Sequence, residues 1–190
     1  GNPVMTNVKD SYRTGIEFIA GYRFTNWLKW NGNITLSRNK IENMTAWVDN
    51  WDYWSNPDEN PLQYKEEYGT TNIAFSPEII AGSLLKINPF SNFSVEFQSK
   101  YVGKQYIDNT SSENRKLDPW FVNDLRLKYN FETSWTRDLS LNLLIANIFD
   151  HKYESNAWTY RYYYEGEKSY MTAFYPQAGV HFMAGLRVLF

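Results

Sequence analysis

The sequence contains no cysteine and only two histidines among its 190 residues. Disulfide frameworks and thiolate metal sites are therefore excluded. A long apolar run is also missing: the most apolar stretch without charge, from Leu139 to Phe149, falls far short of the ~18 residues that a membrane-spanning helix requires. The formal net charge of -2 provides no basic stripe, so no nucleic-acid partner is expected.

Aromatic residues, by contrast, are abundant and make up 18% of the chain. The mean hydropathy of -0.58 is typical of a soluble protein, but alternating apolar and polar residues lower this average without removing an apolar face. The alternation is clear at the end of the chain, where apolar residues fill every second position from Ala178 to Phe190. A period of two residues predicts a β-strand with one apolar face.

Seven stretches alternate in this way: 12–24, 28–41, 79–87, 93–101, 121–131, 139–149 and 178–190. Short turns join them in pairs and predict hairpins, at 25–26, 88–92 and 132–137. Longer segments separate the pairs and are interpreted as loops, at 43–77, 107–118 and 153–174. The predicted fold is all-β, an antiparallel up-and-down meander of about seven to eight strands.

The alternation of short and long connections places every long loop at one end of such a meander, as in outer-membrane barrels. Charged residues such as Glu17, Lys86, Glu96 and Arg126 fall opposite the apolar face, where a watery lumen accepts them. We therefore predict part of a transmembrane β-barrel, with a soluble β-sandwich as the alternative. An odd strand count favours a segment of a larger barrel, because bacterial single-chain barrels use even numbers.

Four segments resemble the closing part of TonB-dependent outer-membrane receptors: 7–17, 117–125, 147–153 and 185–190. The most specific are Asn-Ile-Phe-Asp-His-Lys-Tyr at 147–153 and the terminal Phe190, and the order and spacing of all four carry the likeness. The resemblance implies that residues 1–190 are the C-terminal part of a barrel in the bacterial outer membrane, without its plug domain and N-terminal strands. Phe190 is similar to the signal read by the barrel-insertion machinery, which makes it the candidate assembly residue.

The same resemblance implies a function and a set of partners. The function is active uptake of a scarce nutrient, such as a metal chelate, a vitamin or a glycan. The partners are outer-membrane lipid, the plug domain and remaining strands of the full chain, and the TonB complex. A self-contained small outer-membrane barrel with a structural or adhesive role is the alternative, and the full reading frame would separate the two.

Aromatic residues gather in the first and third predicted loops and are candidates for contact with a small-molecule or glycan ligand: Trp51, Tyr53, Trp54, Trp158, Tyr160, Tyr162, Tyr163 and Tyr164. Such rings offer rigid contact area with a polar tip, and the two loops are predicted to form opposing walls. Because the third loop offers only Arg161 and Lys168 as cations, the sequence favours a neutral glycan or a planar organic ligand over an anionic chelate. The alternative is that the rings form an aromatic belt or pack on neighbouring loops.

No catalytic residue, cofactor or metal site is predicted. His151 beside Asp150 suggests, as an alternative, a barrel enzyme that acts on envelope lipids. Carboxylates of the first loop suggest, as another, a calcium site: Asp49, Asp52, Asp58, Glu59, Glu66 and Glu67. Neither set has the spacing of a known motif, so the sequence favours a solvated strand end and a solvated acidic loop.

Overall fold

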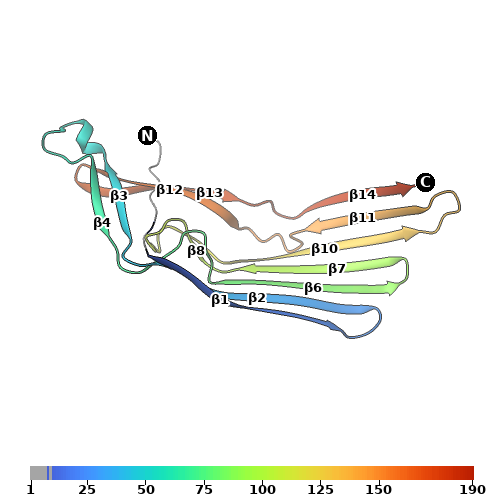
Figure 1. The fold of residues 1–190 in the computed structure, drawn as a ribbon. Coiled ribbons are helices and arrows are strands. Elements are labelled where there is room, and N and C mark those ends of the chain that lie inside the picture. The colour runs from blue at the N-terminus through green and yellow to red at the C-terminus, as the bar shows by residue number, and fades with distance from the viewer. Residues whose placement is uncertain (1–7, 9) are drawn as a thin grey trace.

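A computed structural model describes residue 8 and residues 10–190, so Asn7 and Lys9 of the first receptor-like segment lie outside the described residues. Its main element is an antiparallel sheet in which consecutive members are neighbours (Figure 1). In spatial order the strands are β1 (Ser11–Arg23), β2 (Leu28–Ile41), β6 (Ile79–Phe90), β7 (Phe93–Val102), β10 (Trp120–Phe131), β11 (Asp138–Ala146) and β14 (His181–Leu189). The short β5 (Thr71–Asn72) pairs with β2 as an eighth strand. The predicted meander of seven to eight strands is confirmed.

The strand register joins the apolar positions into one continuous face. One row of paired residues crosses all seven long strands: Tyr22, Trp30, Leu85, Phe97, Leu125, Ile145 and Phe182. Much of this face is open, and Phe18 and Phe182 keep 57% and 80% of their surface exposed. Since a soluble sheet buries such a face, the apolar surface requires an apolar environment outside the described chain.

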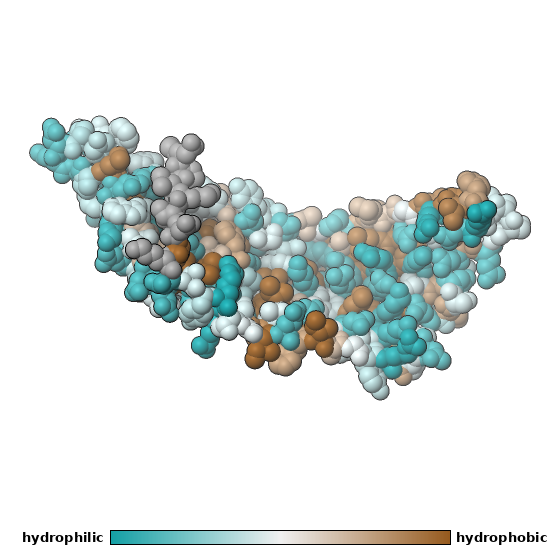
Figure 2. All heavy atoms as spheres, viewed as in Figure 1, coloured by the Kyte–Doolittle hydropathy of each residue, from teal (hydrophilic) through white to brown (hydrophobic). Residues whose placement is uncertain are grey.

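The opposite face is polar and charged. Lys86, Glu96 and Arg126 stand on neighbouring strands in one row; Lys86 Nζ lies 2.8 Å from Glu96 Oε1 and Arg126 Nη1 lies 3.9 Å from Glu96 Oε2. In Figure 2, hydrophilic residues cover much of the visible sheet, while hydrophobic residues gather over β1 and near the C-terminus. The two faces of the main sheet therefore have opposite polarities.

Both edges of the main sheet are open. Within the described residues, β1 pairs only with β2 and β14 pairs only with β11. As the first and seventh members of an antiparallel series, β1 and β14 run in the same direction and cannot close the sheet through antiparallel pairing. Unpaired edges bind further strands readily, so this chain has the geometry of a wall segment.

The turns and loops are sorted as predicted. In Figure 1 the turns between β1 and β2, β6 and β7, and β10 and β11 lie at one end, and every long connection lies at the other. The first turn is longer than expected: it spans residues 24–27 instead of 25–26, because Thr25 Oγ1 accepts hydrogen bonds from the backbone N–H groups of Trp27 and Leu28. No helix in the described part of the chain is long and apolar enough to cross a membrane.

The interpretation of two segments as irregular loops is wrong. The segment 43–77 contains β3 (Thr45–Asn50), the 3-10 helix η1 (Trp51–Trp54) and β4 (Gln63–Glu67), in addition to β5. The segment 153–174 is a hairpin of β12 (Glu154–Tyr164) and β13 (Glu167–Pro176). The middle connection carries only the two-residue strands β8 (Gln105–Tyr106) and β9 (Lys116–Leu117). A small core lies at this end of the molecule, where Ile107, Leu117 and Ala157 form one buried cluster.

Candidate functional site

The two hairpins at the loop end form one sheet, in the order β13-β12-β3-β4. The central pair is parallel, with Tyr162 opposite Asp49 and Tyr163 opposite Asn50. The prediction that the first and third loops form opposing walls is therefore wrong. Backbone pairing between β3 and β12 places the two aromatic groups side by side, on a common support.

Four of the predicted ligand residues form an aromatic ladder, which we define as Trp51, Trp158, Tyr160 and Tyr162. Every second residue of β12 points to the same face, and the ring centroids of Trp158 and Tyr160 lie 6.4 Å apart, those of Tyr160 and Tyr162 5.9 Å apart. Trp51 stacks on Tyr162 at 4.1 Å with 15° between the ring planes. Three rings of the ladder follow one another along β12, and Trp51 of η1 stacks on the last of them, which gives a rigid aromatic surface suited to a flat ligand.

Hydrogen bonds fix the centre of the ladder. The Tyr160 hydroxyl donates to Asp49 Oδ2 at 2.7 Å and accepts from Trp51 Nε1 at 3.2 Å. Burial, together with the Asp49 carboxylate, raises the pKa of Tyr160 above its usual range. The phenol therefore stays protonated and keeps its donor role, so the ring is held without a ligand.

The other candidate ligand residues take different positions. Tyr164 meets Trp51 edge-on at 6.5 Å and extends the ladder. Tyr163 lies on the opposite face of β12, where its hydroxyl donates to Glu66 Oε1 at 2.8 Å; burial and this carboxylate raise its pKa to about 12. Tyr53 and Trp54 form an edge-on pair at 5.3 Å, and Trp54 is 76% exposed. The eight residues thus divide between the ladder, the half-buried contacts of Tyr163 and a separate pair whose outer ring, Trp54, is exposed.

Asp52 holds the tip of the β12–β13 hairpin against η1. The turn residues Glu165 and Gly166 have φ values of 53° and 73°, the left-handed conformation of a two-residue hairpin turn. Their backbone N–H groups donate to the Asp52 carboxylate at 2.8 and 2.9 Å. One carboxylate therefore joins the first and third long connections at their tips.

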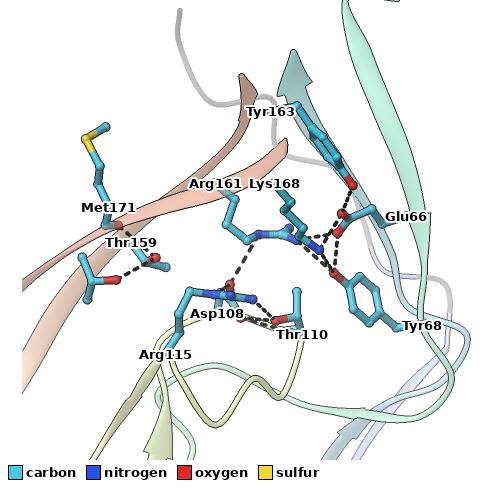
Figure 3. A network of polar contacts seen from close by, with 11 residues as sticks. Glu66, Tyr68, Asp108, Thr110, Arg115, Thr159, Arg161, Tyr163, Lys168 and Met171 are labelled. Carbon is cyan, nitrogen blue, oxygen red and sulfur yellow. Dashed lines mark hydrogen bonds and ion pairs between the residues drawn. The ribbon is translucent and has the colours of Figure 1, made fainter. Parts of the chain in front are cut away.

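A second cluster, the Glu66 network, lies on the face of β12 opposite the ladder (Figure 3). Glu66 accepts hydrogen bonds from Tyr68 and, at 2.8 Å, from Arg161 Nη1, while Lys168 Nζ lies 2.6 Å away. Arg161 Nε lies 3.5 Å from Asp108 Oδ2, which also accepts from Arg115 Nε at 2.8 Å. The network therefore joins all three long connections.

The sequence singled out Glu66, Tyr163, Arg161 and Lys168 for separate roles, but it did not predict that they form a network. Glu66, Asp108 and Arg161 are separated by many residues, and no local spacing connects them. Alternation offered a weak signal, because Arg161 and Tyr163 occupy the polar positions between the ladder rings. Their partners become visible only when β12 pairs with β3.

Glu66 makes the stability of the loop sheet dependent on pH. Burial opposes ionisation of Glu66, but hydrogen bonds from Lys168, Tyr68 and Tyr163 outweigh it and lower the pKa from 4.5 to about 2. A carboxyl with a lowered pKa stabilises the folded state above its unfolded pKa and loses this contribution as the pH falls through its folded pKa. Compared with the Glu66→Gln variant, the wild-type protein should lose its advantage in unfolding temperature as the pH falls from 4.5 to about 2. Glu59→Gln, in the same connection, is the matched control and should follow the wild-type pH profile.

Three of the acidic residues proposed for calcium are used in other contacts. Asp49 accepts from Tyr160 and Gln63, Asp52 from Glu165 and Gly166, and Glu66 from the network. Among the residues that the structure describes, no group of three or more His, Asp or Glu side chains has a metal-binding arrangement. Asp49, Asp52 and Glu66 therefore act as acceptors between the hairpins.

The receptor-like segment 147–153 forms the turn that follows β11. Asn147 is 4% exposed and has a φ of 50°. Its Nδ2 donates to the carbonyl oxygens of His151 and Ala178 at 2.9 and 3.2 Å, and its Oδ1 accepts from His151 N at 2.9 Å. Asp150 Oδ1 accepts from Val180 N at 2.9 Å and lies 2.8 Å from Lys152 Nζ. The segment thus ties the end of β11 to the residues that lead into β14.

The remaining candidates have simple surroundings. The His151 ring stacks on Tyr153 at 6.0 Å, and its neighbour Asp150 contacts Val180 and Lys152. Phe190 follows β14, is 77% exposed and lies 6.1 Å from the Trp135 ring. Its role in assembly stays a prediction.

The fold and its sorted loops define an all-β meander that matches part of a receptor barrel. The chain is similar to the siderophore receptor PiuA from Acinetobacter baumannii, with 15% identity and a TM-score of 0.62 over 94% of this chain and 21% of that one. It is also similar to the ferric yersiniabactin uptake receptor FyuA from Yersinia pestis, with 16% identity and a TM-score of 0.57 over 90% of this chain and 22% of that one.

A mutant of the ferric enterobactin receptor PfeA from Pseudomonas aeruginosa is similar over 95% of this chain and 22% of its own, with 18% identity and a TM-score of 0.55. The chain thus spans about a fifth of the length of these receptors. No family model and no curated protein matches the sequence. At 15–18% identity, the similarity shows the fold alone. The shared fold agrees with the resemblance to TonB-dependent receptors found in the sequence.

Proposed function

We propose that this chain is a wall segment of an outer-membrane receptor whose long connections bind a scarce ligand for TonB-dependent uptake. The observation that carries the proposal is the continuous apolar face across seven strands, opposite a charged face, in a sheet with two open edges. Lipid would cover the apolar face, the remaining strands of the full chain would pair with β1 and β14, and a plug domain would occupy the lumen. The protein would lie in the bacterial outer membrane and engage the TonB complex through its other parts.

Deletion of the full-length gene tests this function. Cells without the receptor should lose energy-dependent accumulation of one scarce nutrient, and a plasmid copy should restore it. The named ligands of the structural matches are iron chelates, so ferric siderophores belong in the panel beside glycans and planar cofactors. Unchanged accumulation of every class, with the receptor present at normal level in the wild type, would contradict an uptake role.

The aromatic ladder is the proposed contact surface for the flat part of the ligand. Replacing Trp158, Tyr160 and Tyr162 by alanine should weaken binding of the transported ligand at least about tenfold, because each stacking contact contributes ~0.5–1.5 kcal/mol beyond its buried area. The measurement is equilibrium binding to cells that carry the full-length receptor, normalised to its surface level. Trp47→Ala is the matched control: Trp47 is 58% exposed on β3 and lies outside the ladder. Normal affinity of the triple variant would assign the ladder to loop packing.

A further inference from the structure

A pocket of about 390 Å³ lies beside the Glu66 network. It is lined by three connections: Tyr68 follows β4, Thr110, Ser112 and Arg115 belong to the connection between β7 and β10, and Arg161, Lys168, Ser169 and Tyr170 belong to the β12–β13 hairpin. Its volume is within the range of small-molecule sites. The pocket is separate from the ladder, because Arg161 points to the opposite face of β12 from Tyr160 and Tyr162.

All charged residues that line the pocket are positively charged. The lining comprises three cations and five residues with hydroxyl groups, two of them tyrosines, and no carboxylate is among the lining residues. Glu66 and Asp108 pair with the cations but are not part of the lining. A bound molecule would therefore meet the guanidinium and ammonium groups and not the carboxylates. Three cations against two carboxylates leave this cluster with a net positive charge.

The two arginines of the pocket are held in place in the absence of a ligand. The Arg115 and Arg161 side chains are only 8% and 13% exposed, and each pairs with Asp108. Within residue 8 and residues 10–190, Arg115 makes its hydrogen bonds through Nε and Nη2 and Arg161 through Nη1. Arg115 Nη1 and Arg161 Nη2 make none in that part of the chain. Guanidinium groups with unused donors in a poorly solvated site attract carboxylate and phenolate oxygens strongly.

Aromatic rings accompany these charges. The Arg115 guanidinium carbon lies 5.4 Å from the centre of the Tyr170 ring, and Lys168 Nζ lies 6.0 Å from that of Tyr68. A planar ring that carries an acidic group could stack beside Tyr170 while its anion meets Arg115 and Lys168. A neutral sugar would leave the excess charge uncompensated.

From this arrangement we infer that the pocket is a subsite for an anionic aromatic group, a carboxylate or phenolate on a planar ring. This inference rests on the proposed receptor function and specifies the chemistry of one part of its ligand. It reverses the preference for a neutral ligand that the sequence suggested. The pocket would select for charge on its own face of the loop sheet, independently of the ladder on the other face.

The test compares two probes that differ in charge, salicylate and salicylamide, on the purified full-length receptor in detergent. Calorimetry should show at least about tenfold tighter binding of salicylate in low salt, decreasing as salt is added, because the pocket supplies cations instead of neutral donors. Lys168→Gln should reduce the preference to less than about threefold. Lys168→Arg should retain it, since the charge is preserved.

Lys65→Gln is the matched control, because Lys65 is an exposed lysine of β4 that pairs with Glu67 and does not line the pocket. It should leave the preference unchanged. Equal affinity for both probes, no binding of either, or a preference that survives Lys168→Gln would overturn the inference. Uptake by cells is not part of this measurement, so a receptor that transports a nutrient but shows no charge preference contradicts the subsite alone. A charge preference without any receptor-dependent uptake contradicts the transport function instead.

Discussion

Replacing Ile34 by arginine is expected to reduce the outer-membrane level of the full-length receptor severely. Ile34 lies in the middle of β2 on the apolar face, paired with Phe18 of β1 and Ala81 of β6. If this face meets lipid, an arginine near the bilayer midplane costs ~2–4 kcal/mol. Membrane fractions probed for the receptor, and its unfolding midpoint in denaturant, measure the loss.

The neighbouring residue provides the matched control. Thr35 stands next in the same strand but faces the opposite side, where it pairs with Glu17 of β1 and Ile80 of β6. Arginine at position 35 would meet the Glu17 carboxylate across the strand and remain hydrated, so Thr35→Arg should be tolerated. Equal membrane levels for Ile34→Arg and Thr35→Arg would show that the two faces do not differ in environment, and would contradict the assignment of the apolar face to lipid.

The residues on each face of the main sheet were predictable from the sequence, because side chains alternate between the two faces of a strand with a period of two. A one-residue shift in register would exchange the two faces, so a regular alternation such as that of β1 fixes both the strand and its orientation. Short turns then fix which strands pair. The sequence therefore predicted the seven strands of the main sheet, their order and their faces, including the shared surface of Phe18, Leu141 and Phe182.

The loop sheet was not predictable in the same way. In β12, both faces carry polar or aromatic side chains: Trp158, Tyr160 and Tyr162 on one, Arg161 and Tyr163 on the other. Because the two faces do not differ in hydropathy, the alternation of apolar and polar residues that indicates a strand is missing here. Glu165-Gly166 is nevertheless a recognisable hairpin turn. Its partner β3 joins it in parallel through two residue pairs only, from a distant part of the chain. Pairing between distant segments leaves no local pattern in the sequence. For this reason the residues of the ladder were assigned to two separate loops, and the Glu66 network was not predicted.

Asn123 is a polar residue at a position of β10 where the alternation predicts an apolar one. It interrupts the apolar alternation of β10, yet it is only 4% exposed. Ser99 of β7 donates to its Oδ1 at 2.7 Å, and its carbonyl oxygen accepts from Ile148 N at 2.8 Å. The polar group is thus satisfied beside the 147–153 turn, so the interruption marks the place where that turn packs on the barrel wall.

Asn147→Ala is expected to destabilise this turn strongly. Three hydrogen bonds of the Asn147 side chain would disappear. The backbone N–H and C=O groups of His151 and the C=O group of Ala178 would then lose their side-chain partner. Alanine also tolerates the φ of 50° poorly, at a cost of ~1–2 kcal/mol. His151 and Ala178 are exposed, so each lost hydrogen bond should cost only its net contribution of ~0.5–1.5 kcal/mol, and with the backbone strain the total loss should be about 3 kcal/mol.

Asn147→Gly separates the two causes, because glycine accepts the backbone conformation but has no side chain to donate or accept. If the side-chain hydrogen bonds dominate, the glycine variant should lose nearly as much stability as the alanine variant; if backbone strain dominates, glycine should recover most of it. Unfolding of the full-length receptor in urea measures the difference, and unchanged midpoints for both variants would show that the turn does not hold β11 to β14. Because the turn also positions the start of β12, the same variants should weaken ligand binding at the ladder even where the barrel remains folded. Loss of binding at an unchanged unfolding midpoint would place the effect of Asn147 in the orientation of the hairpin, and parallel losses would place it in the closure of the wall itself.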